Sequence, residues 1–414
     1  MAKTLDVYFH DDLAGRLTQD DGGAIAFEYT DSWLNRPVAV PLSQSLPLEK
    51  KRYNRKACRA FFSGILPEDA KREIIARNLG ISARNDYAML ERIGGECAGA
   101  VTFLPSGQPL PERNYGYRKL TGKELADIIR ELPRRPLLAG EEGVRLSLAG
   151  AQDKVAVRIE DGEICLPLGG APSTHILKPA LDRFDGVVFN EALCMKLAIQ
   201  CELPAAAVET RNVDGIDYLL VERYDRIHAQ GSKPTVKRLH QEDFCQALGI
   251  VSEQKYQKEG GPSLKQCFAL VRQVSSAPAI DLARLLDAVI FNYLIGNNDA
   301  HGKNFSLLYR GSSESSEVRL APLYDLVCTA CYPELSPEMA MKIGGEYSPQ
   351  KVARKNFEQL AEEAGFGKPL AVARVPVVAD RVLTGLSQLK ITHSIVEKIA
   401  TLIRERAERA RKFA

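Results

Sequence analysis

The sequence predicts an α+β fold with a β-rich first half and a mostly helical second half. Apolar residues alternate within residues 1–29, which is typical of a small antiparallel sheet. Three further runs, 155–159, 174–178 and 218–221, are predicted as strands. From Gln241 onward the apolar residues mostly follow helical spacing. Strands followed by helices, rather than a regular alternation of the two, favour the α+β class.

A chain of 414 residues is too long for one hydrophobic core, so two or three domains are expected. We divide it into an N-terminal part of sheet and helices (1–110), a part with the small-residue loop 147–154 and the strand that ends in Lys178 (111–225), and a helical part with the polar loop Asn298–Asn304 (226–414). Proline-rich stretches at 105–111 and 133–143 are the expected linkers.

Charge and cysteine content indicate a cytoplasmic protein. The formal net charge is +2 and the isoelectric point about 8.0, so nothing global points to nucleic acid or membrane. Nine scattered cysteines, an odd number, are typical of reduced thiols. Cys328 and Cys331 form an isolated CxxC, which we interpret as a packed core pair rather than a zinc site. Neither a secretory leader nor a membrane span is predicted.

Several helix boundaries are indicated by capping residues. Pro67 is expected at the first position of a helix that Gly80 ends. Thr121 and Glu124 predict a capping box for a helix over 122–132.

Two more helices are expected, over 189–201 and from Thr392 to near the end of the chain. The last one is basic at its end, which suits the helix dipole. A contact with a nucleic-acid backbone is the alternative for these cations, which are Arg404, Arg406, Arg409, Arg411 and Lys412.

The polar loop Asn298–Asn304 is the most informative stretch of the sequence. Apolar residues recur at helical spacing from Leu282 to Leu294, and Gly296 can stop that helix. Residues 305–309 resume as an apolar strand. A dense polar loop between two core elements has no packing function, so we expect it to carry chemistry on a rigid scaffold.

Asp299 and Asn304 are five residues apart, with Lys303 between them. The catalytic loop of protein kinases has the same spacing, in which the Asp takes a hydroxyl proton and the Asn binds a metal. A second carboxylate should hold Mg²⁺ against the nucleotide, and Asp325 is the candidate. An ordinary capped helix end with an Asx turn is the alternative for Asp299.

A predicted hairpin explains how Asp325 would reach this loop. Strands at 304–310 and 318–321, joined by residues 311–317, fold Asp325 back beside Asn304.

Residues 147–154 form a loop of small residues before a strand, where backbone N–H groups can approach an anion. The alternative is an ordinary turn. Lys178, at the end of its strand, can reach nucleotide phosphates, and Glu191 can pair with it. The alternatives are a solvated lysine and a glutamate that favours its helix dipole.

The charged segment after strand 218–221 is where a bilobal nucleotide-binding enzyme would cross between lobes. The backbone of Glu222–Tyr224 could then read adenine, and Asp225 could reach ribose. A charged strand end is the alternative.

The order of these motifs resembles the HipA-type serine/threonine kinases, toxins of bacterial toxin–antitoxin pairs. The resemblance spans nearly the whole chain and implies a bilobal, protein-kinase-like fold with a small β-rich N-terminal subdomain and a mostly helical C-terminal lobe. The stretches that carry it are 41–48, 94–101, 146–154, 174–178, 221–226, 241–243, 298–305 and 323–325.

The resemblance also implies roles. Asp299 would deprotonate the acceptor hydroxyl, Lys303 would steady the γ-phosphate, and Asn304 and Asp325 would hold Mg²⁺. The ATP phosphates would contact Lys178 and the loop residues Gly150, Ala151, Gln152 and Lys154. Adenine and ribose would be enclosed by Glu222, Tyr224, Gln241, His301 and Tyr324.

Ser147 matches the family's autophosphorylated serine, whose phosphate of about −1.5 to −2 charge repels the ATP phosphates. One departure is Ala300, where some relatives have Gly; it matters only if that position needs a positive φ.

The implied partners are a HipB-like helix-turn-helix antitoxin, DNA through the antitoxin complex, and a protein acceptor, for which the family suggests an aminoacyl-tRNA synthetase. Growth arrest and persistence would follow from its phosphorylation. Two other functions stay open: a small-molecule kinase of the aminoglycoside or choline type, and a co-repressor with a vestigial nucleotide site. We identify no helix-turn-helix in this chain.

Overall fold

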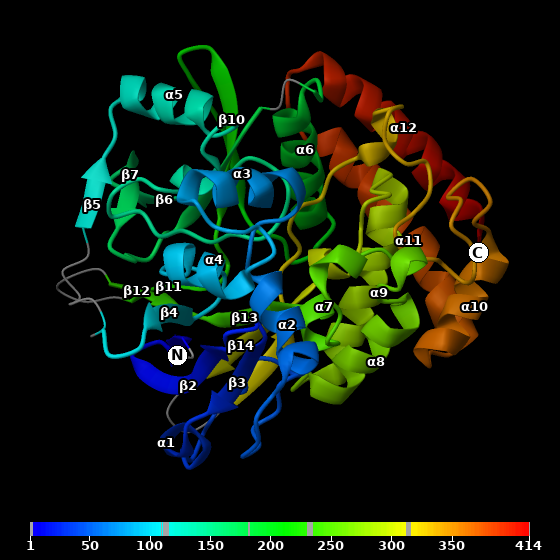
Figure 1. Ribbon diagram of the computed structural model, residues 1–414. Coiled ribbons are helices and arrows are strands. Elements are labelled where there is room, and N and C mark those ends of the chain that lie inside the picture. The colour runs from blue at the N-terminus through cyan, green and yellow to red at the C-terminus, as the bar shows by residue number, and fades with distance from the viewer. Residues whose placement is uncertain are drawn as a thin grey trace.

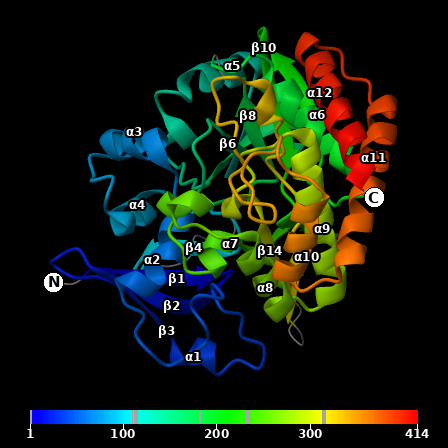
Figure 2. The same cartoon turned by 90° about the vertical axis from the view of Figure 1, so that its right-hand side faces the viewer.

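The computed structural model describes residues 3–108, 110, 116–180, 183–229, 235–311 and 316–413. The chain begins with an antiparallel sheet of order β3-β2-β1-β4. Its strands are β1 (Lys3–Phe9), β2 (Asp12–Gln19), β3 (Ile25–Tyr29) and β4 (Val101–Pro105). This confirms the small sheet predicted from the alternation in residues 1–29. Figures 1 and 2 show it at the lower edge of the molecule.

Four helices lie between β3 and β4: α1 (Asp31–Leu34), α2 (Arg55–Gly64), α3 (Asp69–Leu79) and α4 (Asp86–Ile93). Gly80 ends α3 in a left-handed conformation, φ 66°, as expected. The prediction that Pro67 starts this helix is wrong, because Glu68 is its N-cap. Pro67 instead forms a parallel bridge with Gly150. That bridge brings the α2–α3 corner against the predicted phosphate-binding loop.

A six-stranded sheet of order β5-β7-β6-β8-β10-β9 follows. Helix α5 (Gly122–Glu131) starts with the predicted capping box of Thr121 and Glu124. Helix α6 (Val187–Gln200) packs on β9 and β10. The strands are β5 (Gly116–Lys119), β6 (Val155–Glu160), β7 (Glu163–Leu168), β8 (His175–Pro179), β9 (Val208–Val213) and β10 (Ile216–Glu222).

The second half is mainly helical, as predicted, and Figure 1 shows its helices together on one side of the molecule. They are α7 (Phe244–Ala247), α8 (Leu264–Val274), α9 (Pro278–Ile295), α10 (Arg354–Ala364), α11 (Lys368–Gln388) and α12 (Ser394–Ala410). Short 3-10 helices lie at Pro136–Leu138, Ser252–Gln254, Gln257–Glu259, Gly302–Asn304, Thr329–Cys331 and Arg411–Phe413.

Two small antiparallel sheets follow the six-stranded sheet along the chain. Strands β11 (Arg226–Ala229) and β12 (Thr235–Arg238) pair with each other. Strands β13 (His240–Asp243), β14 (Ser306–Gly311) and β15 (Ser316–Leu320) form the other sheet. The antiparallel pair β14–β15 is the hairpin predicted from the sequence. Residues 312–315 of its predicted loop lie outside the described residues.

Two hydrophobic cores organise the chain. One gathers buried residues from Leu5 to Leu220, and the other gathers residues from Val187 to Ala410. The predicted linker at 133–143 is wrong, because Leu137 and Leu138 are buried in the first core. Pro109 and Pro111 of the other predicted linker lie outside the described residues. The boundaries at 110 and 225 stay predictions.

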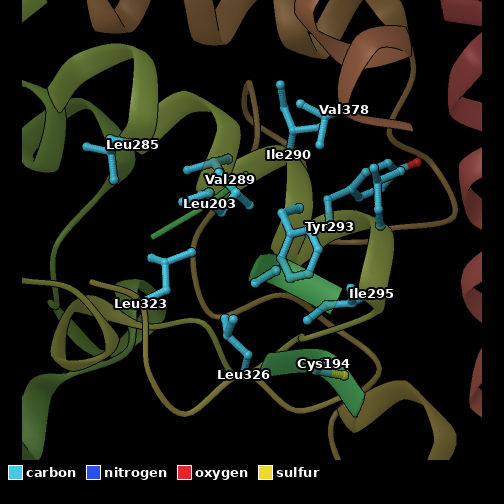
Figure 3. Packing of buried hydrophobic residues seen from close by; sticks show 14 of the residues in the cluster. Cys194, Leu203, Leu285, Val289, Ile290, Tyr293, Ile295, Leu323, Leu326 and Val378 are labelled. Carbon is cyan, nitrogen blue, oxygen red and sulfur yellow. The ribbon is translucent and has the colours of Figure 1, made fainter. Parts of the chain in front are cut away.

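Helix α9 holds the polar loop in place from the second core. Pro278 lies at its start, where a missing N–H costs nothing, and Gly296 ends it at φ 74°. Figure 3 shows Val289, Ile290 and Tyr293 of α9 in this core. Leu323 and Leu326, on either side of Asp325, pack in the same cluster. The core therefore fixes both the loop and the segment that carries Asp325.

The basic end of α12 is partly turned inward. Arg406 donates to the carbonyl of Tyr293 at 3.0 Å, and Arg409 donates to that of Gln350 at 3.1 Å. Both arginines line a cavity of about 470 Å³ between α12 and residues 329–350. These side chains therefore connect α12 to α9 and to the loop before α10. The basic residues have this role in addition to the favourable interaction with the helix dipole that the sequence suggested.

All nine cysteines are buried and free, so Cys328 and Cys331 are a packed pair, as expected. Among the described residues, no cluster of three or more His, Cys, Asp or Glu could hold a metal. None of the helices in the described ranges is long and apolar enough to cross a bilayer.

Candidate active site

The loop after α9 is held by hydrogen bonds from both sides. The carboxamide of Asn297 donates to Oδ1 of Asn292 at 2.8 Å, and its own Oδ1 accepts from the N–H of Asp299 at 3.2 Å. The N–H of Ala340 donates to the carbonyl of Asn298 at 2.7 Å, and that of His301 donates to the carbonyl of Asp299 at 2.7 Å. The polar residues of this loop therefore support one another and hold the position of Asp299.

The side chain of Asp299 is exposed, as a group that meets a substrate must be. Its Oδ1 accepts a hydrogen bond from the hydroxyl of Tyr256 at 2.8 Å. Partial desolvation raises the pKa of Asp299, the Tyr256 hydrogen bond and Lys255 oppose this, and the charge of Asp325 adds to the rise. A carboxylate with a raised pKa is a better proton acceptor, which suits a general base.

The side chains of Asn304 and Asp325 are in contact, as expected from the hairpin between them. The carboxamide Nδ2 of Asn304 donates to Oδ2 of Asp325 at 3.2 Å. Oδ1 of Asn304 accepts from the N–H of His301 at 3.1 Å, and a carbonyl oxygen has a second lone pair for a cation. Asp325 has φ 57°, a left-handed conformation that costs free energy for a non-glycine residue. The surrounding core imposes this conformation at the point where the chain presents its carboxylate.

Lys178 links Asp325 to helix α6. Its Nζ lies 2.7 Å from Oε1 of Glu191 and 2.7 Å from Oδ1 of Asp325. Burial alone lowers the pKa of Lys178, but the charges of Asp325 and Glu191 raise it above its usual value. The charge of Lys178 in turn holds the pKa of Asp325 well below its usual range. The contact of Lys178 with Glu191 was expected; burial raises the pKa of Glu191, and the charge of Lys178 opposes this.

The predicted phosphate-binding loop lies beside this ion pair. Gly150 has φ 103°, and a Cβ there would lie 2.8 Å from Nζ of Lys154. Lys154 donates to the carbonyl of Ala149 at 2.8 Å. Burial and the charge of Lys178 lower the pKa of Lys154 to about 8. Ala151 is exposed and Gln152 is half-buried, so the edge of the loop faces solvent.

Ser147, in contrast, is fully buried. Its hydroxyl donates to the carbonyl of Ile65 at 3.0 Å, and its N–H donates to that of Glu96 at 2.9 Å. A kinase can phosphorylate this hydroxyl only after the loop has left its place.

Lys303 is turned away from the place expected for a γ-phosphate. Its Nζ lies 3.0 Å from Asp243, 3.2 Å from Glu68 and 3.2 Å from the carbonyl of Gly64. These three acceptors match the three donors of an ammonium group. Its side chain is buried, so in this arrangement Lys303 orders the loop instead of contacting a phosphate.

The residues predicted to enclose a base and a ribose gather at the junction of the halves. The rings of Tyr224 and Tyr324 lie 5.8 Å apart, and the Tyr224 hydroxyl donates to Oε1 of Gln241. The Tyr324 hydroxyl donates to the carbonyl of Lys303 at 2.6 Å. Glu222 is exposed, and its N–H donates to the carbonyl of Ala207 at 2.8 Å, so that N–H is not free to read a base.

Asp225 does not fit the ribose contact predicted for it. It is 2 % exposed, and its carboxylate is bound by Arg223, Arg226 and the N–H of Gly99. Arg226 also donates to both oxygens of Glu96 at 2.9 Å. Both carboxylates therefore join the 94–101 segment to the crossing between the halves. Sequence reasoning placed 94–101 in the family but missed this pairing.

The residues present fit a metal–nucleotide complex. Carboxylate and amide oxygens at 325 and 304 are ligands that Mg²⁺ prefers, and the ammonium groups of Lys178 and Lys154 suit phosphates. His301 is buried, and its Nδ1 has no hydrogen-bond partner among the described residues. Burial lowers the pKa of its ring to about 3, so it is neutral. A neutral ring nitrogen of this kind can bond to a polar group of a bound nucleotide.

Comparison with known proteins identifies the family. Residues 146–389 match the family model of the HipA-like C-terminal domain, and residues 5–104 match that of the HipA N-terminal domain. The chain is 44 % identical to putative kinase Y4mE of Sinorhizobium fredii over 99 % of each chain. It is 28 % identical to the serine/threonine-protein kinase toxin HipA of Shewanella oneidensis, over 93 % of this chain and 89 % of that one.

A solved structure agrees with this assignment. The Shewanella oneidensis MR-1 HipA in a complex with HipB and its operator DNA superimposes with a TM-score of 0.86, at 27 % identity. The match covers 99 % of this chain and 100 % of the other, so the bilobal kinase-like fold expected from the sequence is confirmed. The chain belongs to the HipA family of kinases.

Proposed function

We propose that the protein is an ATP- and Mg²⁺-dependent serine/threonine-protein kinase that acts as the toxin of a toxin–antitoxin pair. One observation carries the proposal: Lys178 lies 2.7 Å from both Glu191 and Asp325, and Asp325 is bonded to Asn304. A lysine paired with a helix glutamate, beside a carboxylate and an amide that can hold a metal, is the arrangement that protein kinases use for phosphoryl transfer.

Each residue has a physical task in this proposal. Asp299 accepts the proton of the acceptor hydroxyl, because its carboxylate is exposed and its pKa is raised. Lys178 and Lys154 bind phosphate oxygens. Asp325 and Asn304 would hold Mg²⁺, which supplies charge neutralisation on the transferring phosphoryl group.

The proposed partner is supported by the structure of a relative, and the acceptor is proposed from the likeness to the family. The Shewanella relative was solved with HipB and operator DNA, which supports a HipB-like antitoxin and DNA contact through that complex here. The proposed acceptor is a protein hydroxyl, with an aminoacyl-tRNA synthetase as the candidate. Growth arrest would follow when the antitoxin is absent.

Ser147 is the proposed site of autophosphorylation. Its hydroxyl is buried against Ile65, so a phosphate there cannot be accommodated in place. The phosphorylated loop would have to leave its site and take Gly150 and Lys154 with it. Autophosphorylation would therefore switch the kinase off.

Incubation of the purified chain with radiolabelled ATP and no other substrate tests the proposal. The expected result is one phosphate per chain on Ser147, located by peptide mass spectrometry and absent from Asp299→Ala. A small-molecule kinase would transfer label only when a small hydroxyl compound is added. A vestigial co-repressor would transfer none.

The antitoxin part is tested in cells. Expression of the wild-type chain should stop growth. Expression of Asp299→Ala, or co-expression of wild type with a HipB-like antitoxin, should leave growth normal. Phosphoproteomics on wild type against Asp299→Ala then identifies the acceptor.

A further inference from the structure

The corner between α2 and α3 touches the phosphate-binding loop and the catalytic loop at the same time. On one side, the Ser147 hydroxyl donates to the carbonyl of Ile65 at 3.0 Å, and the N–H of Glu68 donates to that of Gly150 at 3.4 Å. On the other side, Nζ of Lys303 donates to the carbonyl of Gly64 at 3.2 Å. A five-residue segment of the N-terminal part therefore lies between the two loops that phosphoryl transfer requires.

Glu68 is the residue through which this corner reaches the catalytic loop. Its Oε1 lies 3.2 Å from Nζ of Lys303, and its Oε2 lies 2.8 Å from Nζ of Lys255. Lys303 belongs to the catalytic loop itself. Lys255 precedes Tyr256, whose hydroxyl donates to Oδ1 of Asp299 at 2.8 Å. The carboxylate of Glu68 thus contacts both the loop that contains Asp299 and the segment that donates a hydrogen bond to Asp299.

The charged groups of this cluster are largely shielded from solvent, so each charge depends on its partners. Glu68 is 7 % exposed, Lys303 is 8 % exposed, and Asp243 pairs with Lys303 at 3.0 Å. Two ammonium groups face two carboxylates, so the cluster is neutral as a set. Loss of the Glu68 carboxylate leaves buried Lys303 with Asp243 as its remaining carboxylate. It also removes the carboxylate that pairs with Lys255, which favours a rearrangement of the segments that carry these lysines.

We propose that Glu68 is a positioning residue for phosphoryl transfer, which holds Asp299 in place through Lys303 and Lys255. The proposal rests on the function proposed above and extends it to a residue of the N-terminal part. It gives a function to the ion pairs by which Glu68, in the N-terminal part of this chain, contacts Lys303 and Lys255. It also gives Lys303 a task that agrees with its observed contacts.

The same corner connects the state of Ser147 to the catalytic loop. When the loop of Ser147 leaves, the corner loses the hydrogen bonds to Ile65 and from Glu68. The ion pairs to Lys303 and Lys255 then hold a less constrained segment. A phosphate on Ser147 therefore disturbs Asp299 as well as the phosphate site.

Glu68→Gln tests the proposal, because it keeps the size of the side chain and removes its charge. The measurement is the rate constant of phosphate transfer at saturating ATP, together with the ATP concentration at half saturation. We expect the rate constant to fall roughly 10- to 100-fold, since small misplacements of a reacting group have effects of that order. The half-saturating ATP concentration should change less than about threefold, because Glu68 touches no nucleotide-binding side chain.

Glu73→Gln is the matched control, since Glu73 is exposed on α3, the helix that begins directly after Glu68, and is the same residue type. It should keep the wild-type rate. Lys255→Gln is the second variant, which removes one contact of Glu68 at a more exposed position and should lower the rate in the same direction. A wild-type rate in Glu68→Gln, or in Lys255→Gln if Glu68→Gln does not fold, overturns the proposal.

Hydrogen exchange separates this proposal from the proposed function. Amides of residues 299–304 should exchange faster in Glu68→Gln than in wild type or Glu73→Gln, while those of α10 stay unchanged. This readout needs no activity. If the wild-type chain transfers no phosphate but the exchange difference is present, the kinase proposal fails and the positioning contact stands. Equal exchange in all three proteins contradicts the positioning contact.

Discussion

The ammonium Nζ of Lys178 lies 2.7 Å from Oδ1 of Asp325, although Asp325 comes 147 positions later in the chain. Lys178 is on β8 of the six-stranded sheet, whereas Asp325 follows the β14–β15 hairpin in the other half. The ion pair therefore spans the two halves of the molecule. A metal held by Asp325 would lie at this junction, together with the phosphates that Lys178 can bind.

Replacement of the general base should abolish most activity. Asp299→Ala removes the carboxylate that accepts the hydroxyl proton, and we expect the transfer rate to fall roughly 10²- to 10⁴-fold. Nucleotide affinity, measured by fluorescence of a labelled ATP analogue, should stay near the wild-type value. Loss of affinity equal to the loss of rate would contradict the role of Asp299 as a base.

Replacement of the metal ligand should change the dependence on Mg²⁺. Asp325→Asn removes one negative charge beside Lys178, and we expect the Mg²⁺ concentration at half-maximal rate to rise at least about tenfold. A titration of the rate with Mg²⁺ at fixed ATP measures this. A normal Mg²⁺ requirement in Asp325→Asn would exclude it as a ligand.

The lowered pKa of Lys154, about 8, predicts a pH-dependent affinity for ATP. Below that pH the ammonium group binds phosphate oxygens, and above it the neutral amine does not. Affinity should therefore fall as pH rises from 8 to 10, by at most about tenfold per pH unit. Lys178 keeps its charge over this range because Asp325 and Glu191 raise its pKa.

Lys154→Met is the comparison for this pH dependence. It should bind ATP weakly at pH 7 and show a flatter profile up to pH 10. Isothermal titration calorimetry at each pH gives the affinities. Parallel profiles for wild type and Lys154→Met would show that another group titrates.

The buried pairing of Glu96 with arginines predicts an effect on stability. Glu96 is 1 % exposed, and its oxygens accept from Arg226, Arg223 and the hydroxyl of Ser173. Glu96→Ala removes one of the two carboxylates that Arg223 and Arg226 share and leaves Asp225 as the other. Removal of one partner from a buried ionic cluster costs about 3–5 kcal/mol in comparable cases. Chemical denaturation should show this loss, whereas Glu91→Ala on the partly buried surface of α4 should stay within about 0.5 kcal/mol of wild type.

Asp225→Asn decides between the two interpretations of that residue. We expect a loss of stability without a selective loss of ribose recognition. The ratio of affinities for ATP and 2′-deoxy-ATP measures this recognition. A variant of normal stability with a changed affinity ratio would instead support the ribose contact predicted from the sequence.

Local patterns predicted the parts of the site that lie close together in the chain. The helix before Gly296, the Asp299-to-Asn304 spacing and the hairpin follow from capping, loop and turn chemistry that acts over a few residues. The pairing of Lys178 with Glu191 was also expected, because a strand and the next helix are neighbours in most folds. These elements were therefore accessible without the structure.

Contacts between distant segments were not accessible. Gly64 and Lys303 are 239 positions apart, and nothing in either stretch indicates that they meet. Lys303 was expected to contact a phosphate because the family motif implies that role. The motif does not show which way the side chain points. Asp225 looked like a ribose contact for the same reason, whereas its neighbours Arg223 and Arg226 bind it in a buried cluster. The linker at 133–143 was mistaken because proline-rich composition does not show that Leu137 and Leu138 fill a core.

A crystal structure with Mn²⁺ and a non-hydrolysable ATP analogue tests most directly that these side chains share one metal–nucleotide complex. Anomalous scattering should place a metal about 2.0–2.4 Å from carboxylate Oδ of Asp325 and carboxamide Oδ1 of Asn304. Lys178 should then contact a phosphate, and Asp299 should face the terminal phosphate. A metal that contacts neither Asp325 nor Asn304, or a nucleotide bound away from Lys178, would contradict the account.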